Sequence, residues 1–118
     1  MNEQQMRDRT KAFGLRVIRL IGSIPSGKVG DTLGRQLLRW ATSVGVNYRA
    51  AQRARSKAEF LAKLGIVEEE SDESSYWIEL LMESGLVKPA RLSELLNESN
   101  EPTAIVVASI RTARRRKD

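Results

Sequence analysis

Apolar residues recur every three or four positions along almost the whole chain, a spacing that is typical of amphipathic helices. The first stripe consists of Phe13, Val17, Leu20 and Ile24, widened by Ile18 and Ile21. One Pro and two Gly between residues 25 and 30 then interrupt the pattern, because Pro lacks an N–H and Gly favours turns. The pattern predicts a first helix over about residues 5–23.

A second helix is predicted over about residues 31–54, with Asp31 as its N-cap. Its stripe runs through Leu33, Leu37, Trp40, Val44, Tyr48 and Ala51. Ser56 and Glu59 have the spacing of a capping box, which predicts a third helix over about residues 56–84, ending at Gly85. The third stripe runs through Phe60, Leu64, Val67, Ser71, Ser74, Ile78 and Leu81.

A fourth helix is predicted over about residues 89–114, followed by a basic tail over 114–118. Its stripe runs through Leu92, Leu95, Leu96, Ser99, Thr103, Val106 and Ile110. Pro102 lies inside this segment, so we expect a kink near 98–102 or two abutting helices there. Four helices with short connections predict an all-α, antiparallel, up-down-up-down four-helix bundle, as a single domain over 1–118.

Charge is segregated along the 118 residues, although the net charge is only +5. Residues 1–63 carry 13 Lys and Arg against four acids, residues 64–101 carry two against ten, and residues 102–118 carry five against one. In an up-down-up-down bundle, the start of the first helix, the turn between the second and third helices and the end of the fourth helix share one end. The sequence therefore predicts a bundle with one strongly basic end.

This basic end is the strongest candidate for a functional surface, because clustered cations neutralise phosphates largely without regard to nucleic-acid sequence. Arg7, Arg9 and Lys11 of the first helix are expected nearby. The alternative is an ordinary solvated surface. The candidate nucleic-acid-binding residues are Arg49, Arg53, Arg55, Lys57, Lys63, Arg111, Arg114, Arg115, Arg116 and Lys117.

The composition disfavours most catalytic chemistry. The chain has no Cys and no His, which removes thiolate metal ligands, disulfides and every His-dependent catalytic triad. The first residues are polar and charged, unlike a signal peptide, and no stretch reaches the ~20 apolar residues of a membrane span. We therefore expect a cytoplasmic protein that is not an enzyme, has no cofactor or bound metal, and does not enter the membrane.

The acidic run Glu68–Glu73 has two interpretations. A metal site inside the bundle would pair such carboxylates with His on facing helices, and His is absent. Salt bridges with the second helix are favoured, Arg39 with Glu70–Asp72 and Arg35 with Glu73.

Polar residues also lie on or beside the core stripes of the second and third helices. They are Thr42, Ser43, Asn47, Ser71 and Ser74. They predict either a hydrogen-bonded core or subunit interface that fixes helix register, or a ligand pocket; the first interpretation is favoured.

The chain resembles the four-helix-bundle family of proteins encoded within intervening sequences of bacterial 23S ribosomal RNA genes, over about residues 10–115. The matching segments are Gln36–Arg39, Ala41–Ser43, Asn47–Arg49, Ala54–Phe60, Lys63–Leu64, Tyr76–Trp77 and Ala108–Ala113. It departs from the family pattern in its more acidic Val67–Ser71 segment and in Pro102.

The resemblance implies a bundle that assembles as a homopentameric barrel, and a relationship to the accessory variability determinant of diversity-generating retroelements. That relative implies nucleic acid and a reverse transcriptase as partners. We therefore expect a non-catalytic, homo-oligomeric accessory protein that binds RNA or DNA phosphates through its basic end. The alternative is a protein-docking scaffold with no nucleic-acid role of its own.

Overall fold

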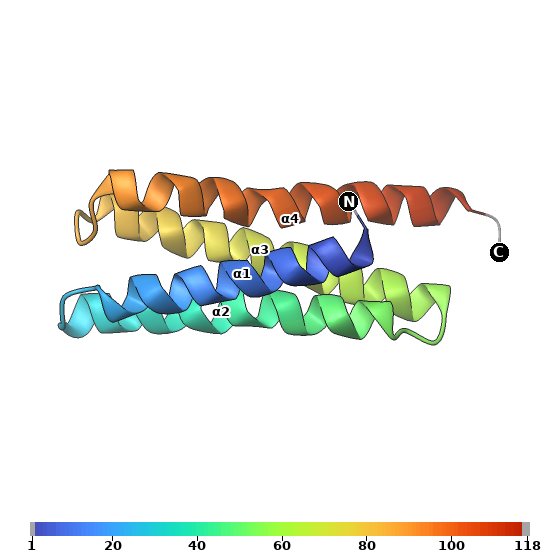
Figure 1. Cartoon of the computed structure of the whole chain (residues 1–118), viewed down its shortest axis with the longest axis horizontal. Helices are drawn as coiled ribbons and strands as arrows, with labels where there is room; N and C mark the ends of the chain where they lie inside the picture. The colour runs from blue at the N-terminus through green and yellow to red at the C-terminus, as the bar shows by residue number, and fades with distance from the viewer. Residues whose placement is uncertain (1, 117–118) are drawn as a thin grey trace.

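Four helices account for most of residues 2–116, the part of the chain that this computed structural model describes. They are α1 (Glu3–Gly22), α2 (Lys28–Gln52), α3 (Lys57–Glu83) and α4 (Pro89–Arg115). Successive helices run in opposite directions along a body of 51 × 21 × 20 Å (Figure 1). The predicted all-α, up-down-up-down four-helix bundle is confirmed.

The start of α2 differs from the prediction. Gly27 is the N-cap and the N–H of Asp31 bonds to the Gly27 carbonyl at 2.9 Å, so Asp31 lies inside the helix rather than at its cap. Asp31 lies in the first turn of α2, where its negative charge interacts favourably with the positive end of the helix dipole. Gly30 makes the tight turn possible, because a Cβ there would lie 2.9 Å from the Pro25 carbonyl oxygen.

The ends of α3 follow the sequence signals. The Ser56 hydroxyl accepts a hydrogen bond from the Glu59 N–H at 3.1 Å, which satisfies one of the unpaired donors of the first turn. The Glu59 carboxylate accepts from the Arg55 N–H rather than from that of Ser56, so the predicted capping box is only half formed. After Glu83, Gly85 adopts a φ of 78°, the left-handed conformation that Gly takes at low cost.

α4 is continuous through Pro102, which is buried. The prediction of two abutting helices is wrong. Pro102 still removes one backbone donor, the one that would have bonded to the Glu98 carbonyl, and the remaining bonds on either side hold the helix together.

The core consists of two apolar clusters separated by a polar layer. The distal cluster, far from the basic end, contains Phe13, Val17, Leu20, Leu37, Ala41, Ile78, Leu81, Val87, Leu92 and Leu95. The proximal cluster, beside the basic end, contains Met6, Val44, Ala51, Leu64, Val67, Val106 and Ile110. The polar layer between them contains Thr10, Glu70, Ser71, Ser74, Ser75 and Ser99, all buried.

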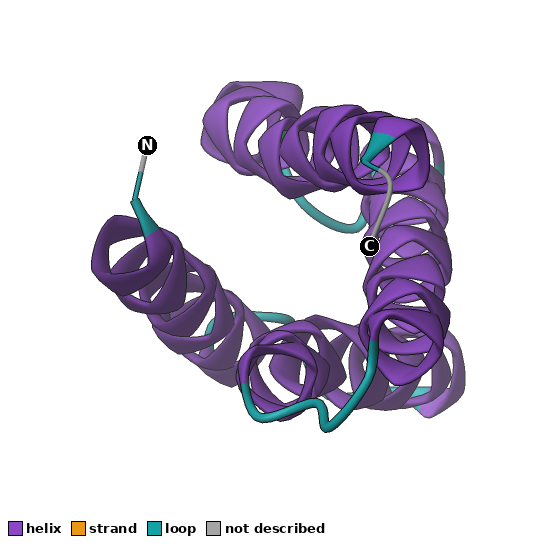
Figure 2. Cartoon of the chain, turned by 90° about the vertical axis from the view of Figure 1, so that its right-hand side faces the viewer, coloured by secondary structure: helices purple, strands orange, loops and turns teal. Residues whose placement is uncertain are grey.

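Ion pairs in the described part of the chain join α1 to α4. Arg9 binds Glu98 through two bonds of 2.6 and 3.0 Å, and lies 3.8 Å from Glu101. Arg16 lies 3.5 Å from Glu94. The bond to Glu98 raises the pKa of Arg9 above its ordinary value. In Figure 2, α1 and α4 lie farther apart than successive helices do, so charged side chains bridge this side of the bundle.

The predicted salt bridges between α2 and α3 are wrong. Arg35 and Arg39 are exposed, and Arg39 lies over the Trp40 ring, 5.5 Å from its centroid. The helix face that meets α3 carries Asn47 instead, whose side-chain amide donates to the Glu70 carboxylate at 2.8 Å. A neutral donor therefore occupies the place that the prediction gave to arginine.

Candidate nucleic-acid interface

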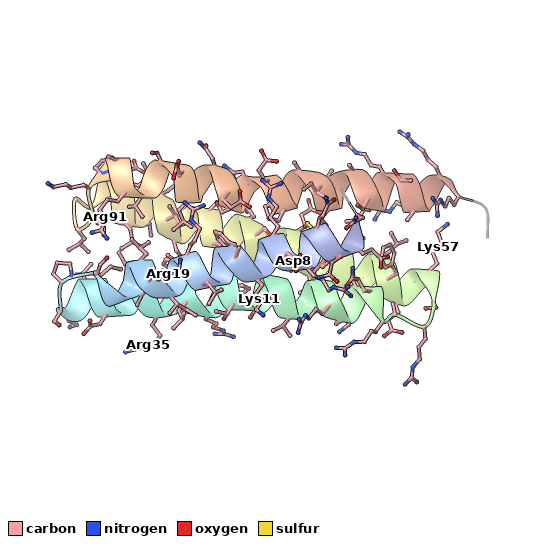
Figure 3. The ribbon with its side chains drawn as sticks, viewed as in Figure 1. Asp8, Lys11, Arg19, Arg35, Lys57 and Arg91 are labelled. Carbon is pink, nitrogen blue, oxygen red and sulfur yellow. The ribbon has the colours of Figure 1, made fainter. Side chains whose placement is uncertain are left out.

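The turn between α2 and α3 projects three of the predicted cations from the end of the bundle. Arg53 is the C-cap of α2, Arg55 follows it in the turn, and both are exposed. Lys57 begins α3, and its ammonium group donates to the carbonyl of Arg116 at 2.5 Å. Because Arg116 follows the last residue of α4, this bond ties the turn to the end of α4. Figure 3 shows Lys57 at the end of the bundle where α4 ends.

The end of α4 contributes most of the remaining cations. Arg111 and Arg115 are one helical turn apart and share a face, and Arg114 and Arg116 extend the cluster; all four are exposed. Lys117 lies outside the described residues. Arg49 is exposed near the end of α2, whereas Lys63 is half-buried on α3. The structure thus brings cations from three helices to one end, as the topology predicts.

Few carboxylates reach this group of cations, which we call the basic end. Within residues 2–116, no carboxylate lies within 4.0 Å of the guanidinium groups of these arginines, namely Arg53, Arg55, Arg111, Arg114, Arg115 and Arg116. Glu3 lines a hollow beside Lys57 and Arg116. Unpaired, exposed guanidinium groups remain available for phosphate oxygens, which they bind in bidentate geometry.

The start of α1 contributes less than expected. Arg9 is occupied by Glu98 and Glu101, and Arg7 donates to Gln52 at 3.1 Å and to Gln4. α1 has 20 residues whereas α4 has 27, and in Figure 1 the start of α1 lies short of the end of α4. This difference places Arg9 beside the acidic middle of α4 rather than at the bundle end.

A second basic surface, which was not predicted from the sequence, lies on the outer side of the α1–α2 hairpin. An open groove of about 260 Å³ lies there, and we call it the α1–α2 groove. It is lined by Arg7, Thr10, Lys11, Gly14, Leu15, Ile18, Thr42, Gly45, Val46 and Arg49. Arg19, Arg35, Arg39 and Arg53 are exposed on the same two helices.

The groove has an apolar centre. Leu15, Ile18 and Val46 remain 44%, 50% and 66% exposed. Ile18 was predicted to widen the core stripe, and this prediction is wrong. The spacing of Lys11, Leu15 and Ile18 forms a second stripe on α1, and this was the signal available in the sequence.

The buried polar residues of the core differ in their hydrogen bonding, and the hydroxyl of Ser71 has no partner among the described residues. Ser75 bonds to the hydroxyl of Ser99 at 2.7 Å and to the Asn100 side chain at 3.0 Å, and Ser74 donates to the Glu70 carbonyl. Burial raises the pKa of the Glu70 carboxyl, an effect that the bond from Asn47 partly offsets. Among the five polar residues singled out in the sequence, only Asn47 forms a side-chain bond to another helix. The hydroxyls of Thr42, Ser43 and Ser74 donate to carbonyls of their own helices, and Thr42 also lines the α1–α2 groove.

Two other kinds of site are absent from residues 2–116. No group of three or more acidic side chains there has the geometry of a metal site. None of the four helices combines the length and hydropathy of a membrane-spanning segment.

The fold and its surface define the class: an antiparallel four-helix bundle with exposed cations gathered at one end. Residues 2–108 match the family described as 23S rRNA-intervening sequence protein, and the chain belongs to that family. No protein of curated function matches it at a significant level.

A solved structure from Bacteroides thetaiotaomicron supports this assignment. It is described as a protein with unknown function from the S23 ribosomal protein family. It is 29% identical, the match covers 94% of this chain and 99% of that one, and the TM-score is 0.83.

Proposed function

We propose that this protein is a non-catalytic, homo-oligomeric accessory protein that binds the phosphate backbone of RNA or DNA through its basic end. The observation that carries the proposal is the convergence of cations from α2, the α2–α3 turn and α4, tied together by the bond from Lys57 to the Arg116 carbonyl. The exposed guanidinium groups of Arg53, Arg55, Arg111, Arg114, Arg115 and Arg116 attract polyanions, and binding releases counterions, which gives salt-dependent and largely sequence-independent affinity.

Oligomerisation would strengthen the surface. Several copies with their basic ends side by side would produce a combined field well above that of one copy. The resemblance stated above suggests five copies, and it suggests a reverse transcriptase of a diversity-generating retroelement as a protein partner. The family assignment fits this proposal.

The test is a binding titration with mixed-sequence duplex and with structured RNA at several salt concentrations. Four exposed arginines of the basic end, Arg111, Arg114, Arg115 and Arg116, are changed together to Gln. The slope of log K against log salt should fall by about 0.7–0.9 for each phosphate that the variant no longer neutralises. Affinity should fall similarly for all nucleic-acid sequences.

A matched control removes the same number of charges elsewhere. Arg19, Lys28, Lys88 and Arg91 are exposed outside the basic end and are also changed to Gln. Equal losses in the two variants would mean that net charge, rather than the basic end, drives binding. No binding by the unaltered protein even at low salt would refute the proposal and favour the protein-docking scaffold, whose complex should survive nuclease and moderate salt.

A further inference from the structure

The surface of α3 is the electrostatic opposite of the α1–α2 groove. Between Leu64 and Val87 the chain has seven acids and no Lys or Arg. Six of these acids lie on the exposed or half-exposed surface, and the seventh, Glu70, is buried. We call this surface the acidic face; it comprises Glu68, Glu69, Asp72, Glu73, Glu79 and Glu83, together with Ile66 and Tyr76.

The acidic face also has exposed apolar side chains. Ile66 is 37% exposed and Tyr76 is 52% exposed, and the Tyr76 ring contacts that of Trp77 edge-on, with centroids 5.4 Å apart. An exposed tyrosine supported by a neighbouring ring suits an interface, because tyrosine buries a large area at a low cost in side-chain entropy.

The two surfaces cannot neutralise each other within one molecule. No Cα atom of α1 lies within 8 Å of one in α3, and the two helices lie at diagonal corners of the bundle (Figure 2). Among residues 2–116, neither the acids of the acidic face nor Lys11, Arg35, Arg39 and Arg49 take part in an ion pair. Both surfaces therefore combine exposed apolar side chains with unpaired charges of opposite sign.

We propose that the α1–α2 groove of one copy receives the acidic face of α3 from a second copy. The apolar centres would come together, Leu15, Ile18 and Val46 against Ile66 and Tyr76, with cations and carboxylates around them. Complementary charge selects the partner and its orientation, while the buried apolar side chains supply most of the affinity.

The contact is heterologous, because each copy offers a different surface to each neighbour. Such contacts continue from copy to copy, and they form a ring when the rotation between neighbours closes. Most of the basic end lies outside the groove and would remain exposed, including Arg53, Arg55 and the arginines at positions 111 and 114–116. The inference specifies how the copies assumed in the proposed function are joined.

The test uses two variants, each with one surface destroyed. One carries Leu15→Glu and Val46→Glu in the groove, and the other carries Ile66→Lys and Tyr76→Lys on the acidic face. All four positions are exposed, so helical circular dichroism should be unchanged; Val46→Glu alone replaces the first variant if the double change unfolds it. Val29→Glu, at an exposed apolar position outside the groove, is the matched control.

Sedimentation should show an oligomer for the unaltered protein and for Val29→Glu, and a monomer for each double variant, with self-association weakened at least tenfold. An equimolar mixture of the two variants should form a 1:1 dimer, because each keeps the surface that is destroyed in the other. High salt should weaken this dimer.

Three results would overturn the inference. An oligomer that survives in both variants would place the interface elsewhere. Variants that are monomeric but do not pair when mixed would mean that the contact is not between these two surfaces. A monomeric unaltered protein would refute self-association, whereas salt-dependent nucleic-acid binding by that monomer would leave the phosphate-binding part of the proposed function intact.

Discussion

The distal and proximal halves of the bundle are built differently. All four helices contribute to the distal cluster, and α1 contributes three of its residues, Phe13, Val17 and Leu20. In the proximal cluster α1 contributes only Met6, and the link between α1 and α4 passes through Arg9 and its acidic partners. Stability should therefore be concentrated in the distal half, away from the basic end, so that the cationic surface can vary without loss of the fold.

The largest effect should come from Leu37→Ala in the distal cluster. Leu37 is fully buried among side chains from all four helices, and the cavity left behind has little room to collapse. We expect a loss of about 4 kcal/mol in the free energy of unfolding, measured by urea denaturation. A loss below about 2 kcal/mol would show that the distal core is loosely packed.

Leu64→Ala makes the same chemical change in the proximal cluster. Leu64 is equally buried, but fewer α1 side chains surround it, so the neighbouring groups can relax more easily. We expect a smaller loss of about 2 to 3 kcal/mol. Hydrogen exchange should also be faster at proximal than at distal amides. Equal losses for Leu37→Ala and Leu64→Ala would contradict the difference between the two halves.

Much of this fold could be predicted from the sequence, because apolar residues spaced three and four apart, as in α3, can lie on one face only if the segment is helical. Six of the seven predicted positions of the α3 stripe are buried, namely Leu64, Val67, Ser71, Ser74, Ile78 and Leu81, and the seventh, Phe60, is half-buried. Ile18 could not be placed in this way, because it lies at the edge of its stripe and its burial depends on where α2 packs. The pairing of Arg9 with Glu98 depends on the register of α1 against α4, which local periodicity does not contain.

The candidate site divides in the same way. Topology alone brings the α2–α3 turn and the end of α4 together, so the cations there could be predicted from loop lengths. The α1–α2 groove depends on the distance and rotation between two helices, which the spacing of apolar residues within either helix does not contain. Such packing details are decided by the whole bundle rather than by one segment.

The polar layer should contribute less to stability than either cluster. Ser75→Ala removes the bonds to Ser99 and Asn100, and Ser99 keeps its bond to the Leu96 carbonyl. The side chain of Asn100 loses its bond from Ser75, but it is exposed, so a water molecule can replace the serine hydroxyl. We expect a loss of about 1 kcal/mol by urea denaturation. A loss as large as that of Leu64→Ala would mean that the layer stabilises the bundle as strongly as an apolar cluster does.

The smallest effect should come from Glu70→Gln, and its sign should be opposite. The pKa of Glu70 is raised above its ordinary value of 4.5 because burial disfavours the carboxylate. The folded protein therefore binds this proton more tightly than the unfolded chain does, so stability falls as the pH rises from 4.5 through the folded pKa and stays lower above it.

The Gln variant cannot ionise and can still accept the hydrogen bond from Asn47, so it should be more stable at neutral pH by less than about 1 kcal/mol. The difference between the variant and the unaltered protein should shrink as the pH is lowered towards 4.5. Urea denaturation of both proteins at several pH values tests this. A variant that is less stable at neutral pH would show that the carboxylate itself, through its bond to Asn47, stabilises the polar layer despite its burial.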